Sequence, residues 1–348
     1  MIYKVIVVDD SAMMRAELSR IIQQDPKLQV VDTAKNGSTV LELIKKHQPD
    51  VITLDIEMPV MNGIETLKLI MKESPLPVVM ISQLTNTGAA ETIEALHIGA
   101  FDFIHKPSGS VSLEMKLQAV AIRNKIKLAA INRNRIKIRK RTWQPKPVKA
   151  VLPFNPLESF KLVAIGVSTG GPRTLLSILP KLPSHFKGSI IIAQHMPANF
   201  TATFAKRLDT VCNLNVKEAE DGETVKRGYI YIAPGGKHIK IYRQHLLSRL
   251  QIIDEIPRTP YKPSVDVLFE SMTQHFQNQW LGVLLTGMGS DGAQGLAKLR
   301  KMGGHTIAES EESCVVFGMP KIAIKLDAAE FILNEDQIVP KIIEIIHQ

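Results

Sequence analysis

The stretch LVAIGVSTGGP, residues 162–172, decides the architecture of the second half of the chain. Its first six residues are apolar or small, which predicts a short strand buried on both faces of a parallel sheet. Pro172 suits the first turn of a helix, where a missing N–H is tolerated. One hydroxyl residue, Ser168, opens the Gly-rich turn between them. Strand, turn and helix in this order are the unit of a doubly wound α/β sheet.

The same alternation continues through the rest of this half. Short apolar runs at 190–194, 229–233 and 281–285 predict further strands. Helical patterns follow Pro172, Phe200, Ser264, Asp291 and Pro320. The second half is therefore expected to form one α/β domain with a parallel sheet.

A separate α/β alternation occupies the first part of the chain. Residues 5–8, 51–54 and 78–81 are apolar runs of strand length. Apolar residues at helical spacing accompany them: Met14, Leu18 and Ile21; Val40, Leu43 and Ile44; Leu113, Leu117 and Val120. A chain of 348 residues is long enough for two such domains, at roughly 100–200 residues each.

A basic segment separates the two halves. Between Lys116 and Leu157 the chain has twelve Lys and Arg residues and no Asp or Glu. Subtracting these twelve charges from the net charge of +9 leaves −3, so the basicity belongs to this segment. Prolines at 145–156 interrupt its helical pattern, as expected of a linker. The expected parts are a domain at 1–122, a basic, Pro-containing linker at 123–156 and a second domain at 157–348.

Several features point to a cytoplasmic protein. No run of about 18 apolar residues is present, so no membrane insertion is expected. The first residues lack the layout of a signal peptide. Cys212 and Cys314 carry no metal or redox spacing, and are expected to be buried thiols of a reducing compartment.

Ser168 lies in the pattern G-x-S-x-G, in the strand–turn–helix context of a nucleophilic serine. Such a turn can also bind a phosphate or dinucleotide, but neither G-x-G-x-x-G nor a Gly-Lys-Ser/Thr ending is present. His195 and Asp291 follow two other predicted strands, although Asp291 alone would also suit a helix N-cap. Because the carboxyl ends of parallel strands share one edge of a sheet, the three residues are expected to form a Ser–His–Asp triad, whose chain order is free.

Three carboxylates are expected to converge at the same edge of the first sheet. Asp9 and Asp10 end its first strand, and Asp55 ends a later one. Carboxylates so close together need a cation, and an all-oxygen set suits Mg²⁺ with retained waters and a phosphate. Ser82 and Lys106 end further strands, where a hydroxyl and an ammonium can hold phosphoryl oxygens.

The first part of the chain resembles the response-regulator receiver family over residues 1–122. The resemblance rests on the motifs VVDDS, LDIEMP, ISQ and HKP, which contain the five residues above. It implies a flavodoxin-like fold in which Asp55 accepts a phosphoryl group. The residues that it implies for Mg²⁺ binding are Asp9, Asp10, Asp55 and the backbone carbonyl of Glu57. Those that it implies for the switch that senses the phosphoryl group are Ser82, Lys106 and Phe103.

The second part resembles the chemotaxis protein-glutamate methylesterase (CheB) family over residues 157–348. The shared motifs are GVSTGG at 166–171, QHMP at 194–197, APGGKH ending at His238, PSVDVLF around Asp266, TGMGSDG at 286–292 and VFGMP ending at Pro320. The resemblance implies a Rossmann-like domain with no metal or cofactor at the esterase site. It implies Ser168 as nucleophile, His195 as general base and acid, Asp291 as orienting carboxylate, and the backbone N–H groups of Met288 and Thr169 as oxyanion donors.

Together the two resemblances imply a phosphorylation-activated enzyme of chemotactic adaptation. It would hydrolyse glutamate methyl esters on methyl-accepting chemoreceptors, releasing methanol, and would deamidate receptor glutamines. A chemotaxis histidine kinase would be the phosphodonor. In the family the unphosphorylated receiver covers the catalytic cleft, so phosphorylation would shift the population from closed to open. A monomer is expected.

Two alternatives stay open on the sequence. The same hydrolase could act in a signalling pathway outside chemotaxis. The receiver could instead control a non-catalytic output that binds nucleic acid through the basic linker, with an affinity that falls steeply with salt. Because the second half contains no recognisable nucleic-acid-binding motif, nucleic acid is not an expected partner.

Overall fold

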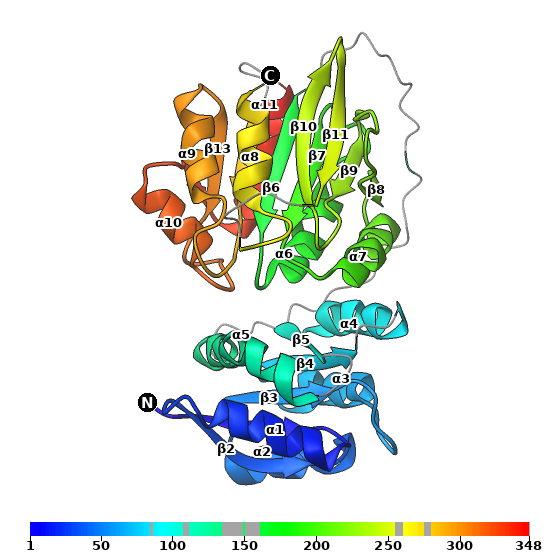
Figure 1. Ribbon diagram of the computed structural model, residues 1–348, viewed down its shortest axis with the longest axis vertical. Helices are drawn as coiled ribbons and strands as arrows, with labels where there is room; N and C mark the ends of the chain where they lie inside the picture. The colour runs from blue at the N-terminus through cyan, green and yellow to red at the C-terminus, as the bar shows by residue number, and fades with distance from the viewer. Residues whose placement is uncertain are drawn as a thin grey trace. The chain divides into compact units, whose positions relative to one another are not determined.

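The computed structural model describes residues 1–83, 86–106, 111–133, 149, 161–254, 260–274 and 280–347. The chain forms two compact units, Met1–Thr142 and Trp143–Gln348 (Figure 1). No helix in these ranges is long and apolar enough to cross a membrane.

The first unit contains a five-stranded parallel sheet in the order β2-β1-β3-β4-β5. Its strands are β1 (Tyr3–Val8), β2 (Leu28–Ala34), β3 (Val51–Asp55), β4 (Val78–Gln83) and β5 (Asp102–Lys106). Its helices are α1 (Ala12–Ile22), η1 (Gly37–Thr39), α2 (Val40–His47), α3 (Gly63–Glu73), α4 (Asn86–Ile98) and α5 (Val111–Ile131). This strand order is that of the flavodoxin-like doubly wound sheets, so the fold prediction for the first unit is confirmed.

Burial explains why the apolar runs of this unit form strands. Val5–Val8 are all inaccessible to solvent, as expected of a strand covered on both faces. The residues predicted to line α1, namely Met14, Leu18 and Ile21, are buried as well.

Helix α5 differs from the sequence prediction in its buried face. Val120 is 61% exposed, and the buried side chains are Ala119, Ile122, Ile126, Ala129 and Ala130. The side chains of the other two predicted contacts, Leu113 and Leu117, lie outside the described residues. Several apolar residues near one another on this helix made the register ambiguous, and packing against the sheet and α1 selects the face.

Helix α5 also continues beyond the expected domain end at residue 122. Two of its basic residues bind carboxylates of the same unit: Lys125 pairs with Asp102 at 3.0 Å and Lys127 with Asp25 at 2.9 Å. Just after the helix, Arg133 pairs with Asp50 at 3.0 Å. The first unit therefore extends at least to Arg133. The remainder of the expected linker lies outside the described residues except for Lys149, which pairs with Asp209 of the second unit.

The second unit contains a seven-stranded parallel sheet in the order β14-β13-β12-β6-β7-β9-β8. Its strands are β6 (Leu162–Val167), β7 (Ser189–Gln194), β8 (Asn215–Glu218), β9 (Tyr229–Ile232), β12 (Trp280–Leu284), β13 (His305–Glu309) and β14 (Phe331–Leu333). Its helices are α6 (Gly171–Ile178), η3 (Leu179–Lys181), α7 (Ala198–Val211), α8 (Val265–Thr273), α9 (Ala293–Lys301), α10 (Met319–Lys325) and α11 (Glu335–His347). The four predicted strands and the five predicted helices are confirmed.

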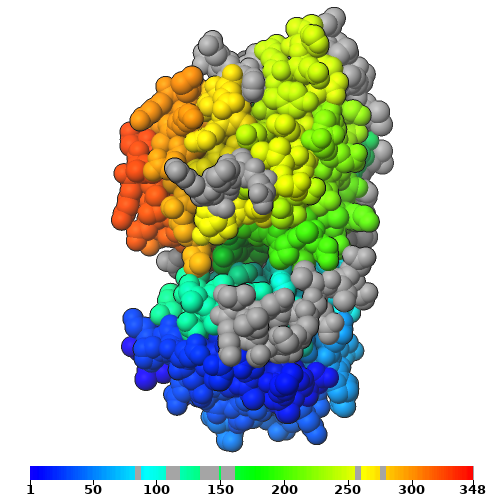
Figure 2. Space-filling view, viewed as in Figure 1, coloured from blue at the N-terminus to red at the C-terminus, as the bar shows by residue number. Residues whose placement is uncertain are grey.

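An antiparallel hairpin, β10 (His238–Gln244) and β11 (Leu247–Ile253), was not predicted. It packs beside α8, and α8 packs beside α9, so that the three elements lie side by side on one face of the unit (Figures 1 and 2). The sequence also gave no signal for β8 and β14, because these edge strands are short and only partly buried.

The strand order of the second unit reverses at its centre. From β6 the chain proceeds through β7, β8 and β9 on one side of the sheet, and then returns to form β12, β13 and β14 on the other. Ligands of doubly wound sheets bind beyond the carboxyl ends of the strands at such a reversal. Strands β6, β7 and β12 therefore deliver the residues that follow them to one place.

Candidate active site

Ser168, His195 and Asp291 form one hydrogen-bonded chain at this edge. Nδ1 of His195 lies 3.0 Å from Oγ of Ser168, and Nε2 lies 2.7 Å from Oδ2 of Asp291. The three residues follow β6, β7 and β12. The imidazole therefore uses one nitrogen toward a hydroxyl and the other toward a carboxylate, the arrangement by which a histidine removes the proton of a serine.

The carboxylate of Asp291 is held by the first turn of α8. Its Oδ1 accepts hydrogen bonds from the Ser264 hydroxyl at 2.8 Å and from Asp266 N at 3.1 Å, and its Oδ2 accepts one from Val265 N at 2.7 Å. Burial alone would raise the pKa of the Asp291 carboxyl, but the hydrogen bond to His195, the charge of that imidazole and the backbone donors outweigh it and lower this pKa. Asp291 thus stays ionised beside His195.

A tight turn presents Ser168 between β6 and α6. Ser168 N donates to Thr286 O at 3.0 Å, and Gly171 N donates to Ser168 O at 2.8 Å. Gly170 has φ +79°, a left-handed conformation that favours glycine. An added Cβ at Gly171 would lie 2.2 Å from Oε1 of Gln194, so no larger residue fits there. The glycines of the motif therefore allow the sharp turn and its close packing.

Two backbone amides beside the serine remain available to a ligand. The Thr169 N–H and the Met288 N–H have no hydrogen-bond acceptor within the part of the chain that the structure describes. Both loops touch the serine, because Thr169 is its neighbour and an added Cβ at Gly287 would lie 2.8 Å from Ser168 Cβ. Unpaired backbone donors of this kind can stabilise a developing oxyanion.

A second cluster lies at the carboxyl edge of the first sheet. Asp9, Asp10 and Asp55 can each offer an oxygen within 4.8 Å of the others. Nζ of Lys106 lies 2.6 Å from Asp55 Oδ2 and 3.0 Å from Asp9 Oδ2. Burial raises the pKa of the Asp55 carboxyl to about 6, although Lys106 opposes this. Three converging carboxylates have the donor chemistry that Mg²⁺ requires.

Comparisons with known proteins place both units. Residues 163–342 match the family described as CheB methylesterase, and residues 5–118 match the response regulator receiver domain. A protein of Carboxydothermus hydrogenoformans named protein-glutamate methylesterase/protein-glutamine glutaminase 2 is 45% identical over 349 residues, which cover 99% of each chain. The chain belongs to the CheB methylesterase family.

Two further CheB relatives come from Thermotoga maritima. A protein-glutamate methylesterase/protein-glutamine glutaminase of that organism is 45% identical over 348 residues, again 99% of each chain. The crystal structure of the Thermotoga maritima CheB methylesterase catalytic domain has 43% identity and a TM-score of 0.52, covering 54% of this chain and 99% of that one. The predicted family and the predicted parallel-sheet architecture are therefore confirmed.

Two other residues expected in the receiver unit lie on the strands beyond β3, Ser82 on β4 and Phe103 on β5. Ser82 is buried at the end of β4 and donates to Gly88 O at 3.1 Å. Phe103 on β5 is buried, with Nζ of Lys125 5.2 Å from the centroid of its ring. A receiver domain in general binds Mg²⁺ at its phosphorylation site, and the carboxylates of this chain fit that ion.

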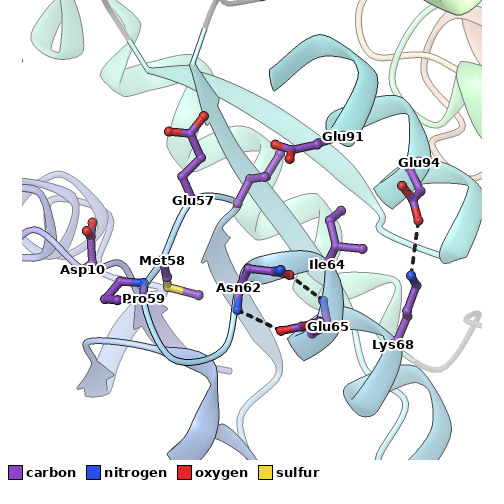
Figure 3. Close-up of a pocket in the computed structure, with 11 residues that line it drawn as sticks. Asp10, Glu57, Met58, Pro59, Asn62, Ile64, Glu65, Lys68, Glu91 and Glu94 are labelled. Atoms are coloured by element: carbon purple, nitrogen blue, oxygen red, sulfur yellow. Dashed lines mark hydrogen bonds and ion pairs between the residues drawn. The ribbon is translucent and has the colours of Figure 1, made fainter. Parts of the chain in front are cut away.

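An acidic pocket of about 680 Å³ opens beside this cluster. Figure 3 shows Asp10 and Glu57 among the residues that line it, together with Glu65, Glu91 and Glu94. Among the described residues that line it, Lys68 is the only cation, and it pairs with Glu94 at 3.2 Å. This lining gives the surface beside Asp10 a negative potential, which attracts cations.

Sequence reasoning missed several residues that support the CheB site. The Gln194 amide donates to the carbonyl oxygens of Ser168 and His195, both at 3.1 Å. The ring of Tyr261 stacks on the imidazole of His195. Gln194 stood in a quoted motif, so its strand-end position was a usable signal. Tyr261 lies in a loop before α8, and nothing in its sequence surroundings pointed to His195.

Two residues of the quoted CheB motifs lie beside the triad and do not belong to it. Nδ1 of His238 accepts a hydrogen bond from Ser264 N at 3.2 Å. The Asp266 carboxylate accepts one from Gly295 N at 2.7 Å and so ties α8 to α9. Both residues thereby fix the helix end that holds Asp291.

Proposed function

We propose that this chain is a protein-glutamate methylesterase and protein-glutamine deamidase of chemotaxis, with Ser168 as nucleophile. Its substrates are methylated glutamates and specific glutamines of methyl-accepting chemoreceptors. The observation that carries the proposal is the hydrogen-bonded chain from Ser168 through His195 to Asp291 at the carboxyl edge of the sheet. The names of full-length relatives supply the substrate class.

The first half of the reaction forms an acyl-enzyme. Nδ1 of His195 takes the proton of Ser168 Oγ as the oxygen attacks the ester carbonyl. The Thr169 and Met288 amides donate to the oxyanion, an effect worth about 3 kcal/mol for one donor. Collapse of the tetrahedral intermediate breaks the carbon–oxygen bond, and the imidazolium gives its proton to the departing methoxide oxygen, which leaves as methanol.

The second half regenerates the serine. His195 takes a proton from a water, the resulting hydroxide attacks the acyl carbon, and Ser168 leaves with the proton from the imidazolium. The product is a glutamate side chain. With a glutamine substrate the leaving group is ammonia, and the remaining steps are the same. These residues supply nucleophile, base and oxyanion donors, so we propose that the esterase step uses no metal or cofactor.

Phosphorylation of Asp55 is the proposed control. A chemotaxis histidine kinase transfers the phosphoryl group from its histidine nitrogen to Asp55, so that a nitrogen–phosphorus bond breaks and an oxygen–phosphorus bond forms. Asp9, Asp10, Asp55 and the Glu57 carbonyl would hold Mg²⁺, which would neutralise charge on the phosphate. The Lys106 ammonium binds a phosphoryl oxygen, and Ser82 and Phe103 sense the change. We propose that the protein works as a cytoplasmic monomer.

A nucleic-acid-binding output is the less favoured alternative. Lys125, Lys127 and Arg133, which belong to the basic segment, are each paired with a carboxylate of the first unit. These charges are therefore partly neutralised within the protein. The second unit matches the CheB methylesterase family over most of its length, which favours the hydrolase.

The proposal is tested by methanol release from methylated receptor membranes. Wild type, Ser168→Ala and Asp55→Ala are compared with and without a small-molecule phosphodonor. We expect wild type to be stimulated by the donor, Ser168→Ala to be inactive, and Asp55→Ala to be active but not stimulated. Full activity of Ser168→Ala would show that the nucleophile is wrong, and wild type without methanol release would overturn the function.

A further inference from the structure

Glu309 is a fully buried carboxylate at the end of β13 that takes no part in the proposed reaction. We propose that Glu309 is a positioning residue. By binding Thr286, it holds the loop that contains Met288 and the turn that contains Ser168 in their reactive arrangement. The inference rests on the proposed function, in which those two elements carry the oxyanion donor and the nucleophile.

The contacts of Glu309 identify the residue that it holds. Its Oε2 accepts a hydrogen bond from Thr286 N at 2.8 Å, and its Oε1 accepts one from the Ser313 hydroxyl at 3.0 Å. Burial raises the pKa of the Glu309 carboxyl to about 7 in spite of these donors. A carboxyl that is costly to bury is therefore kept at this position, with one oxygen directed at Thr286.

Thr286 connects Glu309 to both sides of the serine. Its carbonyl oxygen accepts the hydrogen bond of Ser168 N at 3.0 Å. Its hydroxyl donates to Thr169 O at 3.0 Å and accepts from Val316 N at 2.8 Å. A displacement of Thr286 would therefore move the nucleophile and the Thr169 peptide together.

The loop that follows Thr286 is fixed at every step up to Met288. Gly287 N donates to Val316 O at 3.0 Å, and Gly287 O accepts from Met319 N at 2.8 Å. Within the described residues, the Met288 N–H is the next backbone donor and has no acceptor. Fixed donors aimed at developing charge need no reorganisation during the reaction. Glu309 anchors the start of this fixed segment.

A donor of this kind acts mainly in the transition state. Its misplacement lowers kcat and leaves substrate binding almost unchanged. Replacing a residue that only supported the fold would lower the stability and the folded fraction, but the folded molecules would keep their kcat. A lower kcat per folded molecule at unchanged KM therefore indicates a positioning role.

The test compares three substitutions of Glu309 in the intact chain. Glu309→Gln keeps an acceptor for Thr286 N and turns its amide toward Ser313. Glu309→Met keeps the volume and removes the acceptor. Glu309→Asp keeps the carboxylate but withdraws it by one methylene. We expect Met and Asp to lower kcat for methanol release about 10- to 100-fold at nearly constant KM, and Gln to stay within about threefold.

Two further measurements complete the design. Ser313→Ala, the matched control, removes the other hydrogen bond of Glu309 and should leave kcat within about threefold. The rate at which a fluorophosphonate phosphonylates Ser168, with loss of fluoride, reports the serine without the natural substrate. It should fall in the Met and Asp variants and not in Gln, even if wild type releases no methanol and the proposed function fails.

If Glu309→Met does not fold, Glu309→Asp still tests the inference. Thermal unfolding of each variant defines the folded fraction to which the rates refer. Wild-type kcat and wild-type labelling rates in both the Asp and Met variants would overturn the inference. So would a loss in Glu309→Gln as large as that in Glu309→Met.

Discussion

The ring of Tyr261 stacks on the imidazole of His195, with the centroids 4.4 Å apart and the planes inclined by 8°. The imidazole ring must keep one orientation for its two nitrogens to reach Ser168 and Asp291 at the same time. Stacking restricts rotation of the imidazole away from this orientation and shields one face of the ring from water. We therefore expect Tyr261 to position the proposed base.

Replacement of Tyr261 should test this stack. We expect Tyr261→Leu to lower kcat/KM about 2- to 10-fold, since aromatic pairs contribute about 0.5–1.5 kcal/mol. Tyr261→Phe keeps the ring and should stay within about twofold. Methanol release measured over a range of substrate concentrations gives both constants. Equal losses in the two variants would assign the effect to the hydroxyl and contradict the stacking role.

Replacement of Asp291 should remove most of the activity without changing the shape of the site. Asp291→Asn places an amide where the carboxylate now accepts from His195, Ser264 and Val265. The imidazole then cannot keep the tautomer that accepts the serine proton, and kcat should fall about 10³- to 10⁴-fold.

Ser264→Ala is a milder change at the same carboxylate and serves as the comparison for Asp291→Asn. It removes one of the four donors to the Asp291 carboxylate among the described residues, and should cost tenfold or less in kcat. Single-turnover methanol release measures both variants. An Asp291→Asn enzyme within tenfold of wild type would show that the orienting carboxylate lies elsewhere.

Lys106 should stabilise the receiver because its positive charge offsets the repulsion between two buried carboxylates. Its ammonium contacts both Asp9 and Asp55, which are almost inaccessible to solvent. Lys106→Ala leaves these charges facing each other, so we expect a loss of about 1–3 kcal/mol in the free energy of unfolding. Added Mg²⁺ should raise the thermal midpoint more in this variant than in wild type.

Lys68→Ala is the matched control for Lys106→Ala. Lys68 pairs with Glu94 on the surface, where both side chains are more than half exposed. Its loss should change the unfolding free energy by less than about 0.5 kcal/mol. Scanning calorimetry of the intact chain reports both. A Lys106→Ala protein as stable as Lys68→Ala, with no extra response to Mg²⁺, would contradict the prediction.

Glu309 should make the second unit less stable as the pH rises. Burial disfavours the charged form and raises the pKa of the Glu309 carboxyl to about 7 in the folded chain. The ordinary value of 4.5 applies to the unfolded chain. Between pH 4.5 and 7 the folded state therefore binds more protons than the unfolded state, and stability falls as the pH rises through this window. Above pH 7 the cost is fully present.

Glu309→Gln should remove this dependence. We expect it to be more stable than wild type by about 1–3 kcal/mol at pH 8, from a difference of a few pKa units at about 1.4 kcal/mol each, and to approach wild type near pH 4.5. Within the described residues, the groups that act on the Glu309 carboxyl are Thr286, Ser313, Cys314 and Glu335. Denaturant unfolding followed through the buried Trp280 measures the difference. Glu312→Gln, at an exposed carboxylate, should show no such pH dependence.

Local patterns fixed the strands that are buried on both faces. The run at 162–167 became β6 and the run at 51–54 became most of β3, because a strand inside a parallel sheet is covered on both faces and so is apolar along its length. The hairpin β10–β11 and the register of α5 were not predictable in this way. Their residues are mixed in polarity, and only packing against other elements selects their faces.

The sequence by itself determined which residues stand at strand ends, and therefore that Ser168, His195 and Asp291 would lie along one edge. It also determined the carboxylate cluster of Asp9, Asp10 and Asp55, because a parallel sheet aligns the ends of its strands. Tertiary structure decided what surrounds them. Tyr261 over His195, the end of α8 against Asp291 and Glu309 behind Thr286 join segments far apart in the chain. Such contacts depend on how helices and loops pack across the sheet, which no local pattern encodes.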